Sequence, residues 1–341
     1  MEIAQLAVNG WFSRALAVAA RLGIADVMAG ESMSHTDIAK HTGSDPEVLL
    51  LLMEALTLPG VVERTENGDF RVSEKFARLR TDHPRSMRHF CMLAGELYDD
   101  AWGALLHTVQ TGKSGFQKVF GTSLYEYLEH HPETARVFDN AMVELARPVA
   151  AALARQYDFA EVHKIIDIGG GSGAMLGGIL AEHPQMTGVC ADRQSVCERA
   201  AADLCAVADQ ELARRISFQP TDFFAEVPEG GDRYVLKDVL HHWSYDSGLR
   251  ILTTVGRAMS RTAQDRHADA LQPRLLVLEP LIEHDRDALR ELSQLLICEE
   301  GTRGLNEENM RKLLETAGFE VLSVSRLDTG DAVFECTVRS V

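Results

Sequence analysis

The chain has 341 residues, 45% of them hydrophobic, which is enough for two domains that each bury a core of their own. Acidic residues outnumber basic ones by 51 to 34, so the formal net charge is -17. Such a surface repels nucleic acid phosphates and anionic lipid headgroups, which argues against both as partners.

The first ninety residues are predicted to be helical with one β-hairpin. Apolar residues at helical spacing indicate a helix over residues 12–28. Ser34 is suited to cap the next helix, and Pro46 to occupy the first position of a third. Residues 61–64 and 70–72 flank a turn and predict the two strands of the hairpin. Helices followed by a hairpin are the order of a winged helix.

The winged helix is assigned to residues 1–95. Because winged helices often bind DNA, an alternative function is that of a DNA-binding regulator that senses a ligand. Its expected recognition helix, residues 45–58, carries no Lys or Arg, whereas a helix that enters a DNA groove needs them. The apolar face of that helix suits a protein partner instead. We therefore expect a dimerisation domain, a homodimer and no nucleic acid partner.

The second part of the chain, residues 96–341, predicts an α/β domain. Residues 96–160 should form a helical connection and pocket wall, with a loop near residues 112–121. Short apolar segments then alternate with helices, which is typical of a mainly parallel, Rossmann-like sheet covered on both faces. The last two strands have no helix between them and should form an antiparallel hairpin at the sheet edge. The expected strands are 164–168, 189–192, 216–219, 233–236, 274–278, 320–325 and 333–338.

A glycine-rich turn follows the first of these strands and precedes a helix. Gly169, Gly171 and Gly173 allow a sharp turn in which a ligand lies against the backbone, the fingerprint of a nucleotide crevice. Asp192 ends the next strand, where an acid can accept both ribose hydroxyls. The same string also fits the dinucleotide pattern GxGxxA. Asp167, two residues before the first glycine, and the mid-chain position of the turn favour S-adenosylmethionine over NAD.

Several segments in succession resemble one family. They are ARLGIADVM, FGTSLYEYL, FDNAMVELA, IIDIGGGSGAMLGGILAEHP, TDFFAEVPEGGDRYVLKDVLHHW and KLLETAGFEV, within about residues 10–338. The chain is similar to the S-adenosylmethionine-dependent small-molecule O-methyltransferases, plant caffeate O-methyltransferase-like enzymes and bacterial natural-product methyltransferases with a winged-helix dimerisation domain. The resemblance implies a class I methyltransferase fold, S-adenosylmethionine as methyl donor and S-adenosylhomocysteine as product.

The resemblance also implies roles for individual residues. His241 matches the general base, and Glu279 matches the carboxylate that orients it. The cofactor-binding residues would be Asp167, Gly169, Gly171, Gly173, Asp192, Arg193, Asp222, Phe223 and Lys237. The residues expected to contact a small-molecule acceptor are Met92, Phe138, Met142, His242, Trp243 and Glu299.

The chemistry of methyl transfer to oxygen supports a histidine at this place. A phenol has a pKa of about 10 and a histidine about 6.5, so His241 must take the proton as the C–O bond forms. A carboxylate on the second ring nitrogen fixes the tautomer and stabilises the imidazolium, which is the role expected of Glu279. We therefore expect O-methylation of a small metabolite.

Three positions depart from the family pattern. His242 stands where the family usually has aspartate, Gly304 stands where it has a second acidic residue, and Arg193-Gln194 replace a leucine-proline pair. The first two lie on the acceptor side, so S-, N- or C-methylation with little or no base stays open. Use of the cofactor without methyl transfer also stays open, and the sequence does not name the acceptor.

The remaining features concern compartment and metals. No stretch reaches the roughly 20 apolar residues that span a membrane, and we expect no signal peptide because the first residues have neither a basic start nor a long apolar run. The six cysteines form no CxxC pair, and no His, Cys and carboxylate group has a metal-ligand spacing. We expect a cytoplasmic protein with reduced thiols, no bound metal and no membrane contact.

Overall fold

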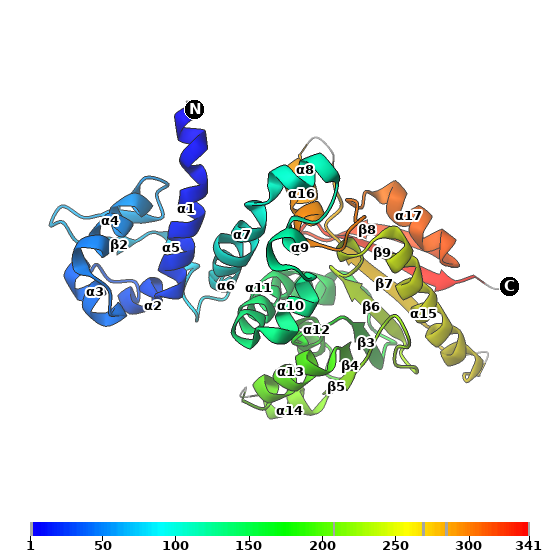
Figure 1. The fold of residues 1–341 in the computed structure, drawn as a ribbon. Coiled ribbons are helices and arrows are strands. Elements are labelled where there is room, and N and C mark those ends of the chain that lie inside the picture. Colours follow the sequence, from blue (N-terminus) through cyan, green and yellow to red (C-terminus); the bar gives the residue numbers. More distant parts are fainter. Residues whose placement is uncertain (1–2, 207–208, 268–269, 284–285, 340–341) are drawn as a thin grey trace. The chain divides into compact units, whose positions relative to one another are not determined.

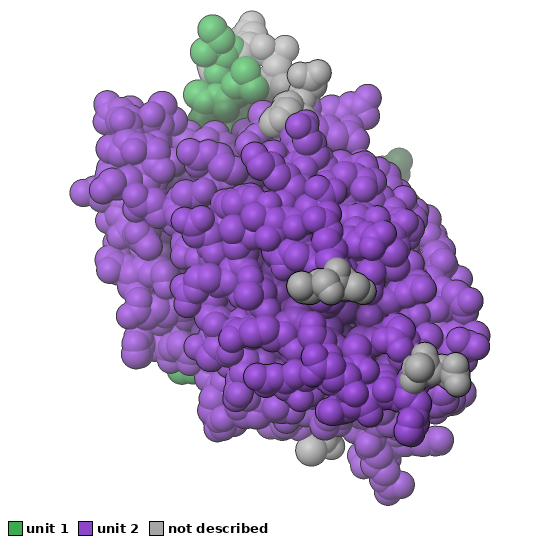
Figure 2. All heavy atoms as spheres, turned by 90° about the vertical axis from the view of Figure 1, so that its right-hand side faces the viewer, with its two compact units in different colours: residues 1–103, 131–145 green, residues 104–130, 146–341 purple. Residues whose placement is uncertain are grey.

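The computed structural model describes residues 3–206, 209–267, 270–283 and 286–339 (Figure 1). The chain forms two compact units: residues 1–103 with 131–145 make unit 1, and residues 104–130 with 146–341 make unit 2 (Figure 2). Helix α11 (Pro132–Gln156) contributes residues to both units. The domain boundary expected after residue 95 stays a prediction.

Unit 1 contains the caps and the hairpin predicted near the start of the chain. The Ser34 side chain accepts a hydrogen bond from Asp37 N at 3.1 Å, and Pro46 lies in the first turn of its helix. The elements of unit 1, besides part of α11, are α1 (Ile3–Arg21), α2 (Ile24–Met28), α3 (His35–Thr42), α4 (Pro46–Thr57), β1 (Val62–Arg64), β2 (Phe70–Val72), α5 (Glu74–Ala77), α6 (Arg88–Leu93), the π-helix η1 (Ala94–Tyr98) and α7 (Asp99–Trp102). Strands β1 and β2 pair antiparallel, which confirms the hairpin.

Two local predictions are wrong, and glycines explain both. The single helix expected over residues 12–28 is two helices, because Gly23 has a left-handed backbone (φ 67°) and separates α1 from α2. The loop expected at residues 112–121 contains helix α9 (Gly115–Phe120). Gly112 and Gly121 end helices there rather than form a loop, since both are C-caps with positive φ.

Unit 2 is built on a seven-stranded sheet with the order β5-β4-β3-β6-β7-β9-β8. The first five of these strands are parallel, and β8 and β9 pair antiparallel at one edge, as predicted. The strands are β3 (Lys164–Ile168), β4 (Thr187–Asp192), β5 (Ile216–Pro220), β6 (Arg233–Lys237), β7 (Arg274–Glu279), β8 (Phe319–Arg326) and β9 (Ala332–Val338). The helices of unit 2, besides the end of α11, are α8 (Leu105–Thr111), α9, α10 (Leu124–His130), α12 (Ala174–Glu182), α13 (Gln194–Ala206), α14 (Gln210–Arg214), the 3-10 helix η2 (Leu240–His242), α15 (Tyr245–Gln264), α16 (Ala288–Ile297) and α17 (Glu307–Thr316).

Successive residues of the central strands lie in two separate hydrophobic cores. Ile166 and Leu236 pack in the core that includes residues of α15 and α17, whereas Ile165 and Val235 pack in the core that includes residues of α11 and α12. Side chains alternate between the two faces of a strand, so helices cover both faces of the sheet (Figure 1). The α/β fold class is therefore confirmed, and the carboxyl ends of the parallel strands are left to form a site.

The structure also bears on membrane contact and thiols. Across the described ranges, no helix has the combination of length and apolar character that crossing a bilayer requires. The cysteines whose side chains are described, Cys91, Cys190, Cys197, Cys298 and Cys336, form no disulfide. The side chain of Cys205 lies outside the described residues.

Candidate active site

The order of the parallel strands brings most of the predicted site residues to one edge of the sheet. The chain moves outward from β3 to β4 and β5, then returns to the other side of β3 with β6 and β7. Ligands of open α/β sheets bind where the order reverses in this way. From β5 to β7, the carboxyl ends carry Asp222, Asp192, the glycine turn, Lys237 and Glu279.

The glycine turn between β3 and α12 depends on backbone conformations that suit glycine. Gly169, Gly171 and Gly173 have φ values of 70°, 59° and 76°. Nothing lies within 4 Å of the place where a Cβ of Gly171 would be, so the turn is open on that side. Gly170, which the motif did not single out, is needed for space: its Cβ would lie 2.5 Å from Asp167 Oδ2 and 2.8 Å from Cys190 Sγ.

Asp167 is a buried carboxylate beneath this turn. It pairs in register with Cys190 of β4 and Val235 of β6, and only 1% of the residue is exposed. Among the described residues, no group donates a hydrogen bond to its Oδ2. Burial, together with the negative charge of Asp192, raises the pKa of Asp167 to about 7, against the opposing charge of Lys237. A ligand that brings positive charge here would stabilise the ionised form.

Asp192 connects the end of β4 to the turn. Its Oδ2 accepts a hydrogen bond from Gly171 N at 2.9 Å, and its Oδ1 accepts one from Arg193 N at 2.7 Å. The carboxylate is therefore fixed against the loop that a ligand would lie on. Arg193 forms an ion pair with Glu129 and donates to the Tyr125 carbonyl at 3.0 Å, so its guanidinium holds helix α10.

Aromatic side chains gather beside the same turn. Phe223 Cε1 lies 3.8 Å from the place where a Cβ of Gly169 would be. The ring of Trp243 stacks on Tyr125, with centroids 5.5 Å apart and planes at 20°, and meets Phe223 edge-on at 5.8 Å. Asp222 is exposed and accepts a hydrogen bond from Phe224 N at 3.0 Å. Phe223, Trp243 and Tyr125 thus form a cluster of aromatic rings beside the turn.

The structure places His241 in contact with Glu279, as the resemblance predicted. His241 Nδ1 lies 2.5 Å from Glu279 Oε2. The second carboxylate oxygen accepts from the backbone N–H groups of Leu240 (2.9 Å) and His241 (3.3 Å), so Glu279 also caps η2. Burial alone would lower the pKa of His241, but the charge and hydrogen bond of Glu279 outweigh it and raise that pKa above 6.5.

His242 lies against a different partner. Its Nδ1 is 3.2 Å from Cys298 Sγ, and its ring centroid is 4.3 Å from that of His241. Burial and the neighbouring His241 and Lys237 hold the pKa of His242 well below its ordinary value, so this ring is neutral. Burial and the charge of Glu279 raise the pKa of the Cys298 thiol, so the thiol keeps its proton.

Lys237 and Glu299 both interact with other residues of the protein, Lys237 through an ion pair and Glu299 through hydrogen bonds. Lys237 forms an ion pair with Asp238, a non-glycine residue with φ of 55°. Such left-handed strain clusters at functional sites. Glu299 accepts hydrogen bonds from Ser244 N at 2.6 Å and Ser247 Oγ at 3.0 Å, which tie it to the start of α15. A contact between Glu299 and the acceptor stays a prediction.

The other predicted acceptor contacts belong to unit 1. Met92 lies on α6 within the core of that unit, while Phe138 and Met142 lie on α11. Their role at the acceptor stays a prediction. The departure at Gly304 has a local reason, because a Cβ there would lie 2.8 Å from Ile282 Cγ1 and 3.0 Å from Glu291 Cδ. An acidic side chain at this position would require Ile282 or Glu291 to shift.

Sequence reasoning missed five residues of this region, namely Gly170, Tyr125, Glu129, Asp238 and Cys298. Tyr125 and Glu129 lie in or beside the segment FGTSLYEYL, which was matched as a whole without a role for its members. Cys298 carries no motif, and only the fold brings it to His242.

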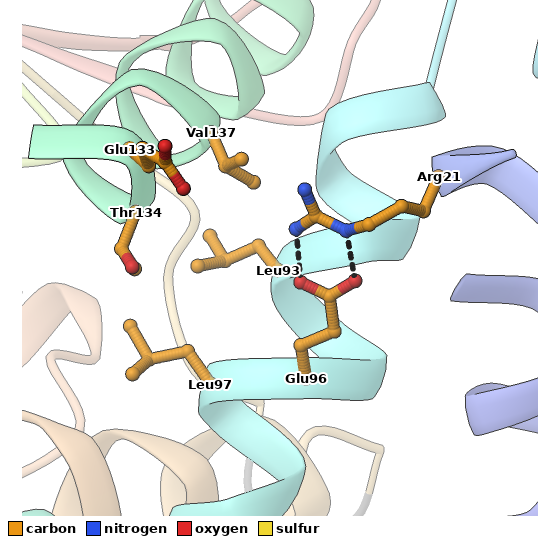
Figure 3. Close-up of a pocket in the computed structure, with 7 residues that line it drawn as sticks. All are labelled: Arg21, Leu93, Glu96, Leu97, Glu133, Thr134 and Val137. Carbon is orange, nitrogen blue, oxygen red and sulfur yellow. Dashed lines mark hydrogen bonds and ion pairs between the residues drawn. The ribbon is translucent and has the colours of Figure 1, made fainter. Parts of the chain in front are cut away.

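A separate pocket of about 200 Å³ lies within unit 1 (Figure 3). It is lined by Arg21, Leu93, Glu96, Leu97, Glu133, Thr134 and Val137, none of which was predicted as a site residue. Arg21 and Glu96 face each other in it as a two-point ion pair, drawn as dashed lines in Figure 3. That pair satisfies the charges of Arg21 and Glu96, and Glu133 adds a further carboxylate to the lining.

Two family descriptions match the chain in succession. Residues 4–77 match an O-methyltransferase dimerisation domain, and residues 102–320, more than half of the chain, match an O-methyltransferase domain. The chain belongs to the O-methyltransferase family. This confirms the resemblance, and the dimerisation-domain match indicates a homodimer, as expected.

Similar proteins and similar solved structures agree with this family assignment. O-demethylpuromycin-O-methyltransferase of Streptomyces alboniger is 36% identical over 319 residues, which cover 92% of this chain and 81% of the relative. The structure of LaPhzM has a TM-score of 0.89 at 31% identity and covers 99% of this chain and 98% of its own. NcsB1 from neocarzinostatin biosynthesis, in complex with S-adenosylmethionine and 2-hydroxy-5-methyl naphthoic acid, has a TM-score of 0.78 at 26% identity, with 96% of each chain covered. The enzyme class and the S-adenosylmethionine cofactor are thereby confirmed.

One group in the described part of the methyltransferase has the geometry of a metal site. Ligand atoms of Asp238, His241 and Glu279 lie within 4.8 Å of one another. His241 Nδ1 contacts Glu279 and Asp238 Oδ2 is paired with Lys237, whereas Asp238 Oδ1 has no hydrogen-bond partner among the described residues. The methyltransferase family needs no metal, and we assign none to this group.

Proposed function

We propose that this methyltransferase methylates a hydroxyl group of a small aromatic metabolite, with His241 as the general base. The observation that carries the proposal is the 2.5 Å contact between His241 Nδ1 and Glu279. Because Glu279 accepts from two backbone N–H groups as well, it acts as the acceptor, and His241 Nδ1 carries the proton. The lone pair of His241 is then on Nε2, available to take a proton from the acceptor.

The glycine turn fits S-adenosylmethionine. Asp192, fixed against the turn, would accept from the ribose hydroxyls, and the open side of Gly171 leaves room for a ligand. The unpartnered Oδ2 of Asp167 fits the positive charge of the amino acid end. The cofactor supplies a sulfonium methyl group, so the acceptor oxygen gains a C–O bond as the S–C bond breaks and S-adenosylhomocysteine remains.

The protein's own contribution is to position the acceptor and to move one proton. The hydroxyl proton passes to His241 Nε2, and Glu279 stabilises the imidazolium that forms. The aromatic cluster of Phe223, Trp243 and Tyr125 suits an aromatic acceptor, since aromatic rings pack against one another stacked or edge-on. Positioning is the larger effect, because methyl transfer requires the two reacting atoms in line.

Several relatives have names that describe methyl transfer to oxygen. Their names include O-demethylpuromycin-O-methyltransferase and 3-amino-4-hydroxybenzoate 4-O-methyltransferase. This likeness supports our proposal that the acceptor of the present chain is a hydroxylated aromatic metabolite. N-methylation is the second candidate, because 8-amino-8-demethylriboflavin N,N-dimethyltransferase of Streptomyces davaonensis is 32% identical over 93% of this chain.

The dimer contact is assigned to helix α1. Four of its large apolar side chains are exposed in the single chain, and the bulkiest of them is Trp11 at 71%. The others are Ile3, Leu6 and Val18. The dimerisation-domain match includes Leu6, Trp11 and Val18 and begins just after Ile3, so we expect a second copy of the chain to cover this face. Trp11→Glu should then shift the protein from dimer to monomer in light-scattering chromatography.

Release of S-adenosylhomocysteine from hydroxylated and aminated aromatic acceptors tests the reaction. His241→Ala should abolish turnover of a hydroxyl acceptor while calorimetry still detects binding of S-adenosylmethionine. His241→Gln serves as the matched control, since it fills the site without a base. Full turnover of an amine by both variants, with no reaction at any hydroxyl, would favour N-methylation and contradict the proposal.

A further inference from the structure

The two adjacent histidines have different partners for the same ring atom. His241 Nδ1 contacts a carboxylate, and His242 Nδ1 contacts the thiol of Cys298 at 3.2 Å. A carboxylate only accepts, so it selects the tautomer of His241 with hydrogen on Nδ1. A protonated thiol has a hydrogen to donate, and in the described part of the chain Cys298 Sγ has no hydrogen-bond partner besides His242.

The thiol contact selects the opposite tautomer of His242. An imidazole nitrogen accepts a hydrogen bond better than a thiol sulfur does, so the S–H of Cys298 donates to Nδ1. The low pKa of His242 keeps the ring neutral, and a neutral imidazole has one hydrogen, which must then be on Nε2. Two neighbouring rings thus differ: Nε2 of His241 is a proton acceptor, and Nε2 of His242 is a proton donor.

Both Nε2 atoms are available to a ligand. Among the described residues, neither atom has a hydrogen-bond partner, and neither is enclosed completely. The ring centroids are 4.3 Å apart, so one small molecule can reach both nitrogens. An aspartate, which the family usually has in place of His242, could only accept when ionised. The polarity of this contact is therefore reversed in the present chain.

We infer that His242, held in its Nε2–H tautomer by Cys298, selects acceptors in which the reacting hydroxyl has a neighbouring hydrogen-bond acceptor such as a carbonyl oxygen. The hydroxyl proton passes to His241 while His242 donates to the carbonyl. The second hydroxyl of a diol could accept from the N–H of His242 only through a phenolic oxygen, which is a weaker acceptor than a carbonyl oxygen. The inference rests on the proposed function, because it assumes that His241 meets the reacting hydroxyl.

The tautomers can be measured without any substrate. In the full-length protein with ¹⁵N-labelled histidine, imidazole nitrogen NMR should show His242 protonated at Nε2 and His241 protonated at Nδ1. Cys298→Ala should remove the preference of His242, whereas Cys336→Ala, another buried cysteine in β9, should not. A hydrogen on Nδ1 of His242 in the unmodified protein would overturn the inference.

Selectivity is measured with two probes of similar size, 1-acetyl-2-naphthol and 2,3-dihydroxynaphthalene. Titration into the complex with S-adenosylhomocysteine should give a lower Kd for the hydroxy ketone, by about tenfold for one matched hydrogen bond. His242→Asp should reverse the order, and His242→Asn, which keeps an N–H donor, should retain part of it. Equal binding of both probes, including no binding of either, would overturn the inference.

The same samples separate this inference from the proposed function. Binding of S-adenosylmethionine and methylation of plain 2-naphthol depend on the cofactor site and on His241, and not on the polarity of His242. If neither 2-naphthol nor the hydroxy ketone is methylated while the hydroxy ketone binds preferentially, the proposed reaction fails and the tautomer assignment of His242 stands. If 2-naphthol is methylated and the probes bind equally, the proposed reaction stands and the assignment of His242 fails.

Discussion

The substitution Asp167→Asn should remove one titrating group's contribution to the pH dependence of two properties of the protein. Asp167 is enclosed, its Oδ2 has no partner among the described residues, and its pKa is raised from its ordinary 3.8 to about 7 by burial and by Asp192. The unfolded chain ionises this group near its ordinary pKa, whereas the folded protein without ligand holds the proton up to about pH 7. The folded state therefore binds more protons over this range.

The sign of the effect on stability follows directly. Between about pH 4 and pH 7 the free energy of unfolding should fall as pH rises, by up to about 4 kcal/mol from this group, and should then level off. Asparagine has the same shape and no charge, so the variant should lack this decline. Urea unfolding at pH 5 and pH 8, for both proteins, measures the difference.

The affinity for the cofactor should also depend on the ionisation of Asp167. The positive charge of S-adenosylmethionine favours ionised Asp167, so binding below pH 7 releases a proton and affinity rises with pH, by up to about tenfold per unit. Calorimetric titration at pH 6 and pH 8, in buffers of different ionisation enthalpy, counts the released protons. Equal affinity at both pH values with no proton release would refute the reasoning. His241→Gln, measured in parallel, separates the other titrating group.

Three further predictions concern the base, the turn and a helix cap. The kcat/KM of a hydroxyl acceptor should fall at low pH with a midpoint above 6.5, because the pKa of His241 is raised. Since that raised pKa depends on Glu279, Glu279→Gln should lower the midpoint and reduce kcat about 100-fold. Gly170→Ala should abolish cofactor binding in calorimetry, since its Cβ would lie 2.5 Å from a carboxylate oxygen, whereas Gly177→Ala, with nothing within 4 Å, should not. Asp45→Ala should lower the free energy of unfolding by about 1 kcal/mol with cofactor affinity unchanged, because Asp45 caps α4 through two backbone N–H groups.

The sequence alone was sufficient wherever a feature depends on residues close along the chain. Strand β3, its glycine turn and the following helix were predicted with almost no error, because apolar runs and glycines act through their immediate neighbours. The hairpin β1-β2 and the Ser34 cap were found for the same reason. The break at Gly23 was missed, since an apolar stripe continues across it and hides the change of backbone conformation.

The site itself depends on residues far apart in the chain. Residue matching predicted Glu279 for His241, although 38 positions separate them, but their 2.5 Å contact exists only because β6 and β7 lie side by side. No local pattern indicated Cys298 beside His242, or the burial that raises the pKa of Asp167. Local backbone preference decided which segments are strands and turns. The sheet order, fixed by burying both faces under helices, decided which side chains meet at the strand ends and hence what chemistry they can perform.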